Sequence, residues 1–261
     1  MREAMVMSTS GDERRERILH EVMAHGKATV TGLSELLGVT TETIRKDLMT
    51  LGERNVISKR HGFVTLATPM PERDSEKGES LHLAEKTAIA ERAARLTPQD
   101  AAVFLDTSTT VLCLASLLAL RSDLTVITNS IDVCQALARS GSKILVTGGL
   151  YRTKSNSCVG SWALRSMESV NVDVAFLGCD GFSPEGPTIR SYQEVEFKRM
   201  VARRAKRTVL LADTSKLGNT GLYTFANYAD FSLMIFEREL NVGEMKVLPK
   251  NVALIDVVPP S

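Results

Sequence analysis

Residues 39–48 read Val39-Thr40-Thr41-Glu42-Thr43-Ile44-Arg45-Lys46-Asp47-Leu48, which is the pattern of a short amphipathic helix. Thr40 or Thr41 can cap the first turn of this helix through its hydroxyl group. Ile44, Leu48 and Leu51 recur at i, i+4 and i+7, so they share one buried face. That spacing leaves four polar side chains on the outer face, namely Thr41, Thr43, Arg45 and Lys46.

Two more helices are predicted upstream of this one. Residues 31–38 form a short amphipathic helix that ends at a glycine, and residues 38–40 form a turn of the length that joins two steeply crossed helices. An earlier helix begins in the charged run 14–17 and carries apolar residues at the helical period in its middle. The three helices predict a helix–turn–helix unit with one small shared core.

A β-hairpin is predicted directly after the third helix. Residues 56–58 and 63–66 are two short runs of β-forming residues, separated by Lys59-Arg60-His61-Gly62. Backbone phosphates are the natural ligands of such a basic hairpin, or wing. We therefore predict a winged helix–turn–helix domain over residues 11–66 that binds double-stranded DNA. The residues expected to contact DNA are Thr41, Thr43, Arg45, Lys46, Lys59, Arg60 and His61.

Each of these features also has an ordinary explanation. An Arg-Lys pair on a helix usually only faces solvent, and three-helix units also serve as protein-interaction modules. An adaptor that never touches DNA therefore stays open as an alternative, although it leaves the cationic hairpin without a role. The order helix, helix, turn, helix and basic hairpin favours DNA.

Length and composition set wider bounds. A chain of 261 residues with 43% hydrophobic content suggests two domains, and a net charge of +1 neither supports nor excludes a nucleic-acid partner. The four cysteines are widely spaced and lack metal-ligand spacing, as expected of a reduced protein. No apolar run approaches the roughly 18 residues of a membrane span. We expect a soluble, cytoplasmic protein with no metal, no cofactor and no membrane partner.

The composition changes twice along the chain. Residues 67–80 contain Pro69, Pro71 and Gly78 among alternating charges, which is typical of a linker. From residue 81 to residue 261, short apolar strands alternate with helices, and this predicts a mainly parallel sheet covered on both faces. The predicted strands are 102–105, 124–127, 143–146, 172–177, 208–211, 231–235 and 252–255. The predicted helices are 84–96, 111–120, 131–139, 161–168 and 194–205.

Ligands of such sheets bind beyond the carboxyl ends of the strands, where this chain is polar. Ser108, Thr109 and Thr110 stand where a strand turns into a helix, so their hydroxyls and backbone N–H groups outline an anion site. Lys216 follows a later strand and can balance the charge of a phosphate. The alternative is that Ser108 or Thr109 only caps the helix.

Further polar residues follow other strands. Asp106, Asn129, Asp180 and Glu194 offer groups suited to sugar hydroxyls, although each one alone is also a common turn or capping residue. Gly149 permits close approach of the backbone to a ligand. Two cations follow it, and we expect both to face solvent rather than to reach over the site: Arg152 and Lys154.

The predicted α/β domain has few side chains suited to catalysis. All four histidines precede residue 83, so neither a histidine triad nor a histidine-bound metal is available to the α/β domain. We predict no catalytic residues. Asp180 with Glu194 could in principle exchange protons on an aldose, so an isomerase-like enzyme with a regulatory N-terminal domain stays open as an alternative.

From about residue 14 to residue 257 the chain resembles the DeoR family of bacterial sugar-metabolism regulators. The motifs that carry the resemblance are 43-TIRKDL-48, 59-KRHG-62, 105-LDTSTT-110, 128-TNS-130 and 212-ADTSK-216. It implies a winged helix–turn–helix joined to an effector domain similar to ribose-5-phosphate isomerase. It also implies that Ser108, Thr109, Thr110 and Lys216 hold the phosphate of a phosphorylated sugar.

These observations lead to one functional hypothesis. We expect a repressor of a sugar-metabolism operon, in which Arg45 and Lys46 reach a major groove and the wing grips phosphates. A phosphorylated sugar in the second domain shifts the spacing of paired DNA-binding domains, and the linker carries this coupling. Recognition of two half-sites implies a homo-oligomer, either a dimer or a tetramer.

Overall fold

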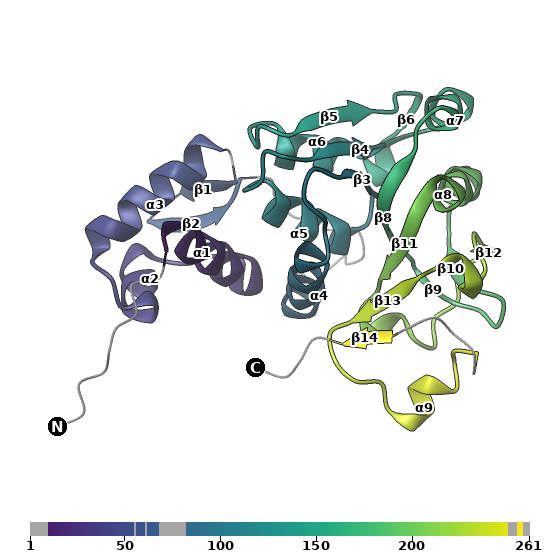
Figure 1. Cartoon of the computed structure of the whole chain (residues 1–261). Helices are drawn as coiled ribbons and strands as arrows, with labels where there is room; N and C mark the ends of the chain where they lie inside the picture. Colours follow the sequence, from purple (N-terminus) through teal and green to yellow (C-terminus); the bar gives the residue numbers. More distant parts are fainter. Residues whose placement is uncertain (1–9, 55, 61, 68–81, 250–254, 258–261) are drawn as a thin grey trace.

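The computed structural model describes residues 10–54, 56–60, 62–67, 82–249 and 255–257. It contains an N-terminal helical unit with a hairpin and a larger α/β unit (Figure 1). Apart from residue 67, the predicted linker lies outside the described residues. The same holds for His61 and for most of the predicted last strand.

The N-terminal unit confirms the predicted helix–turn–helix. Its helices are α1 (Gly11–His25), α2 (Val30–Leu37) and α3 (Thr41–Glu53). The turn between α2 and α3 passes through Gly38, whose φ of 65° is left-handed and therefore suits glycine. Ile18 of α1, Leu33 of α2 and Ile44 of α3 are buried together in one core. The apolar stripes of the three helices thus form the shared core that their spacing predicts.

The predicted wing is present as an antiparallel hairpin of β1 (Ile57–Arg60) and β2 (Phe63–Leu66). Arg60 pairs with Phe63 across a turn that contains Gly62, which has a φ of 83°. Ala28, between α1 and α2, makes two backbone hydrogen bonds with Val64 at 2.8 and 2.9 Å. These bonds attach the wing to the helices.

The second unit is built on a seven-stranded parallel sheet with the order β14-β13-β11-β8-β3-β4-β5. Its strands are β3 (Ala102–Leu105), β4 (Thr125–Thr128), β5 (Lys143–Val146), β8 (Val172–Gly178), β11 (Ala205–Leu211), β13 (Leu233–Phe236) and β14 (Ile255–Val257). The mainly parallel sheet is therefore confirmed. β11 begins three residues before the predicted strand, where its polar first residues pair with β8.

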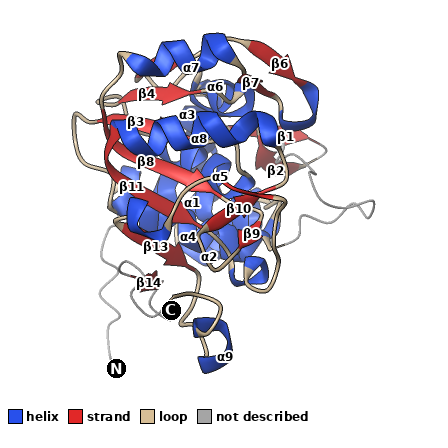
Figure 2. Ribbon diagram, turned by 90° about the vertical axis from the view of Figure 1, so that its right-hand side faces the viewer, coloured by secondary structure: helices blue, strands red, loops and turns tan. Residues whose placement is uncertain are grey.

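Helices cover both faces of this sheet, so alternate residues of one strand enter different cores. Val103 of β3 lies in the core that includes α4, α5 and α6, whereas its neighbour Phe104 packs with α7 and α8. Figure 2 shows α8 in front of the sheet and α4 and α5 behind it. The helix bounds are α4 (Leu83–Arg95), α5 (Thr109–Leu118), α6 (Ile131–Leu137), α7 (Ser161–Glu168) and α8 (Tyr192–Arg204).

Several short elements escape the pattern of the sequence. They are β6 (Leu150–Arg152), β7 (Ser157–Val159), β9 (Gly181–Phe182), β10 (Pro187–Ile189), β12 (Tyr223–Thr224), α9 (Val242–Met245) and the 3-10 turns η1 (Thr153–Ser155), η2 (Thr214–Lys216) and η3 (Tyr228–Asp230). β6 pairs with β7, and β10 pairs with both β9 and β12. Strands of two or three residues are too short to show alternation, so partners elsewhere in the fold define them.

Candidate functional site

Helix α3 turns its cations to solvent. Thr40 caps the helix, because its Oγ1 accepts a hydrogen bond from the backbone N–H of Thr43 at 3.2 Å. Arg45 and Lys46 are both exposed. The Arg45 side chain is 60% exposed, and its Nη1 lies 3.5 Å from Glu42 Oε2. Exposed ion pairs of this kind contribute little, so the guanidinium is available to another anion.

The two threonines predicted to face outward are only half exposed. Thr41 is the first residue of α3, and Thr43 has its hydroxyl 3.0 Å from Thr40 Oγ1. The Thr43 hydroxyl therefore also contributes to the helix cap, and its contact with DNA stays a prediction. The exposed face of α3 carries the cations Arg45 and Lys46 together with Glu42, Met49 and Glu53.

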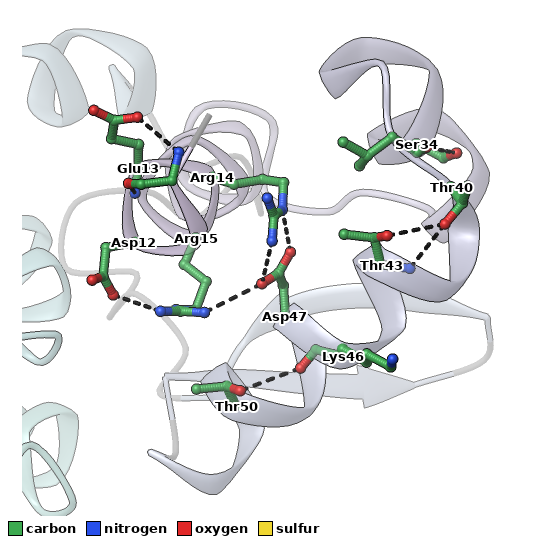
Figure 3. A network of polar contacts seen from close by, with 12 residues as sticks. Asp12, Glu13, Arg14, Arg15, Ser34, Thr40, Thr43, Lys46, Asp47 and Thr50 are labelled. Atoms are coloured by element: carbon green, nitrogen blue, oxygen red, sulfur yellow. Dashed lines mark hydrogen bonds and ion pairs between the residues drawn. The ribbon is translucent and has the colours of Figure 1, made fainter. Parts of the chain in front are cut away.

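Beneath these cations lies Asp47, a buried carboxylate that the sequence reading left unassigned. Asp47 accepts hydrogen bonds from Arg14 Nε at 2.5 Å and from Arg15 Nη1 at 3.3 Å, as Figure 3 shows. Its side chain is 4% exposed. The signal for this network is an acid within the apolar stripe of α3, together with an unusual run of arginines at the start of α1. The network fixes the position of α3 against α1.

The wing adds exposed charge beside α3. Lys59 is exposed on β1, and the side chains of Arg60 and His61 lie outside the described residues. Lys27, which the sequence reading omitted, is exposed with its Nζ 4.7 Å from the centroid of the Phe63 ring. A cation over an aromatic face is held in place without losing its charge.

A second candidate site is a cavity of about 250 Å³ at the carboxyl ends of the adjacent strands β3, β8 and β11. We call it the strand-end cavity. Five cationic and three acidic side chains line it. The structure brings six of the predicted effector residues to its wall, namely Ser108, Thr109, Thr110, Asp180, Glu194 and Lys216. The other three, Asp106, Asn129 and Gly149, are not among its lining residues.

The loop between β3 and α5 forms one wall of the cavity. Ser108 caps α5, since its Oγ accepts a hydrogen bond from Val111 N at 3.2 Å. The capping role and a place in the cavity wall are therefore both realised in one residue. The first N–H groups of a helix have no acceptor inside the helix, and they favour an anion at this end. Thr109 and Thr110 add hydroxyls to the same wall.

A buried ion pair supports the floor of the cavity. Lys198 of α8 places its Nζ 2.5 Å from Asp106 Oδ2 and 2.8 Å from the carbonyl oxygen of Gly178. The side chains are 5% and 2% exposed. Burial lowers the pKa of Lys198, but the nearby carboxylates of Asp106 and Glu194 outweigh burial and raise its pKa overall. Lys198 therefore stays protonated as a hydrogen-bond donor.

Asp106 thus orients Lys198 and also accepts a hydrogen bond from Gly178 N at 2.9 Å. Gly178 is required there, because a Cβ atom would lie 2.3 Å from the Cβ of Ser108. The sequence reading missed Lys198 altogether. Its signal was a lysine one turn after Glu194, on the buried face of a predicted helix.

The two cations expected in solvent both line the cavity, and the expectation is corrected for Arg152, which is paired in the cavity wall. Arg152 Nη1 lies 3.1 Å from Glu194 Oε1, in a pair whose side chains are 22% and 12% exposed. Lys154 is exposed and also contributes to the wall. The short strand β6 and the turn η1, which the sequence pattern does not reveal, direct both side chains to this edge of the sheet.

Asn129 and Gly149 serve the backbone instead of the cavity. Asn129 Nδ2 donates to the carbonyl oxygen of Cys158 at 3.0 Å, and the main chains of these residues are also bonded. A Cβ atom on Gly149 would lie 2.6 Å from the carbonyl oxygen of Val159. Both residues hold the β6–β7 hairpin against the sheet, and neither is among the residues that line the cavity.

The carboxylates of the cavity are engaged by neighbouring groups. Asp180 Oδ2 accepts a hydrogen bond from Arg190 N at 2.8 Å, and Glu194 is paired with Arg152. Burial raises the pKa of the Cys179 thiol to about 12, so it is not a nucleophile at neutral pH. Among the described residues we find no group of three His, Cys, Asp or Glu side chains that could hold a metal ion.

A winged helix–turn–helix with exposed cations on its third helix and its wing, joined to an α/β domain with a charged cavity, defines a DNA-binding regulator with a ligand-sensing domain. The chain belongs to the DeoR family. The family model described as "DeoR-like helix-turn-helix domain" matches residues 14–69, and that described as "DeoR C terminal sensor domain" matches residues 81–238. The predicted family is thereby confirmed, and the adaptor alternative is replaced by a transcriptional regulator.

Curated relatives agree with this assignment along almost their whole length. The "HTH-type transcriptional repressor GlcR" of Bacillus subtilis (strain 168) is 34% identical over 92% of this chain and 93% of its own. The "Putative aga operon transcriptional repressor" of Escherichia coli O157:H7 is 30% identical over 93% of this chain and 92% of its own. Both relatives are named as transcriptional repressors.

Among solved structures, a D-ribose-5-phosphate isomerase in complex with phospho-erythronic acid is similar with a TM-score of 0.38 and 17% identity. The match covers 50% of this chain and 52% of that chain. In the part of the chain that the structure describes, no helix has the length and hydropathy needed to cross a membrane.

Proposed function

We propose that this regulator is a sequence-specific repressor of a sugar-metabolism operon, and that a phosphorylated sugar in the strand-end cavity controls it. The observation that carries the proposal is the combination of a hydroxyl-rich helix start with several cations around one small cavity. Neither feature alone would suffice, since helices are often capped by serine and lysines often face solvent.

The phosphate is assigned to the end of the cavity beside α5. Ser108, Thr109 and Thr110 offer backbone and hydroxyl donors there, and Lys216 of η2 supplies a positive charge from the end of β11. Lys216 is only partly exposed, so its charge is less screened than that of a surface lysine.

The sugar is assigned to the rest of the cavity. Lys198 and Arg152 are donors there and Asp180 and Glu194 are acceptors, so the cavity presents both partners that a hydroxyl group needs. The cavity of about 250 Å³ is smaller than the roughly 300–1,000 Å³ typical of drug-sized ligands. A single phosphorylated monosaccharide suits that size better than a nucleotide.

Operator DNA is assigned to the cationic face of the first domain. In our proposal Arg45 and Lys46 enter the major groove, while Lys59, Arg60 and His61 of the wing contact backbone phosphates. The exposure of Arg45, Lys46 and Lys59 supports this arrangement. Two half-sites require at least two copies of the chain, as a dimer or a tetramer.

A mobility-shift experiment tests the proposal directly. DNA from upstream of the protein's own gene is titrated at fixed salt, with and without pentose phosphates, hexose phosphates and inorganic phosphate. We expect specific binding that one sugar phosphate weakens, and we expect Lys216→Ala to remove that response while Lys143→Ala, an exposed lysine on β5, retains it. Specific binding that ignores every compound would refute the effector assignment, and absence of specific binding would refute the operator assignment.

An isomerase activity is the second candidate, because the carboxylates of Asp180 and Glu194 line the same cavity. Their engagement with Arg190 N and Arg152 counts against it. Steady turnover of a pentose or hexose phosphate that Asp180→Asn abolishes would establish an enzyme.

A further inference from the structure

One helix links the strand-end cavity to the first domain. The N-cap of α5, Ser108, lines the cavity, and the ten residues of the helix cover about 15 Å at 1.5 Å per residue. Most of its side chains are buried, from Thr110 to Leu118. A helix packed this closely moves as a unit, since a dense interior does not let one turn shift alone.

The far end of α5 is joined to α3 by a hydrogen bond. Arg54 is the C-cap residue of α3, and its Nη1 donates to the carbonyl oxygen of Leu120 at 2.8 Å. Leu120 lies two residues beyond the last residue of α5. Thus the Arg54 side chain connects the end of α3, which presents Arg45 and Lys46, to the residue just beyond α5, which lines the cavity.

A second polar contact lies beside the first. His20 Nδ1 of α1 is hydrogen-bonded to Glu91 Oε1 of α4, and α4 and α5 share a buried core with the first domain. Figure 1 shows α1 beside α4 and α5. The Glu91 carboxylate accepts a hydrogen bond from His20, and this contact raises the pKa of His20 above its usual value.

The boundary between the domains is incompletely filled. A cavity of about 460 Å³ lies among α1, α4 and the end of α5, with Arg17, Glu91, Leu117 and Leu120 in its wall. Space at a packed boundary lets one helix shift without a clash, whereas a filled boundary would resist the shift. The hydrogen bonds of Arg54 with Leu120 and of His20 with Glu91 then couple the movements of the two domains.

We propose that the Arg54–Leu120 and His20–Glu91 contacts form an interdomain latch, through which α5 transmits occupancy of the strand-end cavity to α3. The mechanism rests on the proposed function. An anion bound at the start of α5 displaces the helix, the Leu120 carbonyl moves with it, and Arg54 carries the movement to α3. Coupling then passes through this direct contact between the two domains.

The latch predicts a specific defect in Arg54→Ala. The measured quantity is the ratio of operator affinities of the full-length protein without and with the most effective sugar phosphate of the panel. We expect that ratio to fall roughly 2- to 30-fold, the range that mutations between two coupled sites produce. Affinity for DNA alone and for the sugar phosphate alone should each stay within about twofold. Glu91→Gln, which keeps the shape of the side chain, should reduce the ratio in the same direction.

Arg139→Ala is the matched control, because Arg139 is an exposed arginine of the second domain just beyond α6. It should respond like the wild type. An unchanged ratio in both Arg54→Ala and Glu91→Gln would overturn the latch.

Hydrogen exchange of the ligand-free proteins separates this proposal from the proposed function, because it needs no effector. Arg54→Ala should increase exchange of the last turns of both α3 and α5, whereas Arg139→Ala should not. Faster exchange at both helix ends would support the latch even if no sugar phosphate acted on the wild type, a result that would refute only the proposed function. An exchange pattern identical to the wild type would overturn the latch even if a sugar phosphate did act.

Discussion

The two domains use positive charge in opposite ways. On the first domain, Arg45, Lys46 and Lys59 are exposed on a helix and a hairpin. In the strand-end cavity, Lys198 is buried against Asp106 and Arg152 is paired with Glu194. Exposed cations attract a long polyanion and are readily screened by salt, whereas buried cations are fixed by their acidic partners before any ligand arrives. The cations expected to bind DNA therefore lie on the surface, whereas the cations of the cavity are held in fixed positions by acidic partners.

The largest effect is expected from breaking the buried pair. Lys198→Met leaves the Asp106 carboxylate buried without its cation, which typically costs about 3–5 kcal/mol of unfolding free energy. Urea denaturation followed by circular dichroism measures the loss. The matched control is Lys206→Met, because Lys206 pairs with Asp173 on the surface with its side chain 74% exposed, and it should change stability little. Equal stability of the two variants would contradict the contrast between buried and exposed cations.

A smaller effect is expected in ligand binding. Lys216→Ala removes a charge-assisted contact to the phosphate, so affinity for the sugar phosphate should fall roughly 10- to 150-fold. Isothermal titration calorimetry measures the change, with Lys143→Ala as the control. Retained affinity in Lys216→Ala would move the phosphate away from η2.

The first domain also contains a buried charge network, that of Asp47 with Arg14 and Arg15. Asp47→Ala removes the acceptor shared by Arg14 and Arg15, and we expect a loss of about 1–3 kcal/mol of stability. DNA affinity should fall at every salt concentration with an unchanged salt slope, since no phosphate contact is lost. Asp12→Ala is the control, because Asp12 pairs with Arg15 but is 86% exposed. A changed salt slope in Asp47→Ala would mean that the arginines themselves contact DNA.

Loss of an exposed cation should change the salt dependence of DNA binding. Lys59→Ala should lower the slope of log affinity against log salt by about one unit, with a similar loss for specific and unrelated DNA. Fluorescence anisotropy at several salt concentrations measures both quantities. Lys246→Ala, an exposed lysine of the second domain, should leave the slope unchanged. A loss confined to the specific sequence would show instead that Lys59 reads bases.

The smallest effect is a pH dependence of the interdomain contact. The hydrogen bond with Glu91 raises the pKa of His20 above its usual 6.5, so the pair stabilises the fold below pH 6.5 and loses this contribution as pH rises through the raised pKa. The wild type should therefore exceed Glu91→Gln in melting temperature more at pH 6 than at pH 9. The difference is small because both side chains are partly exposed. A constant difference across this range would contradict the charged pair.

Sequence patterns predicted those features of the fold that depend on interactions between residues close together in the chain. The apolar stripe of α3 and the hydroxyl loop before α5 each depend on neighbours within about one helical turn, so the chain itself reveals them. Their sequence signals correctly placed Arg45 on an exposed face and Thr109 at a strand end. Lys216 belongs to the same group, because it follows directly on a strand.

Contacts between distant residues were not predictable in this way. Lys198 and Asp106 are 92 positions apart, and Arg152 meets Glu194 across 42 positions. Asp106 and Asn129 follow strands as ligand-binding residues often do, yet Asp106 is engaged by β8 and α8 and Asn129 by β7. The order of strands in the sheet decides such cases, and the periodicity of one segment carries no information about that order.

The order of strands also has a consequence for synthesis of the chain. Val103 of β3 pairs with Val174 of β8, so β3 lacks this neighbour until 71 more residues have been made. At about 5–20 residues per second that wait lasts roughly 4–14 s on the ribosome. The winged helix–turn–helix has left the ribosome by then, while the sheet edge beside β3 is still open. During synthesis, the DNA-binding domain can therefore fold before the sensor domain is complete.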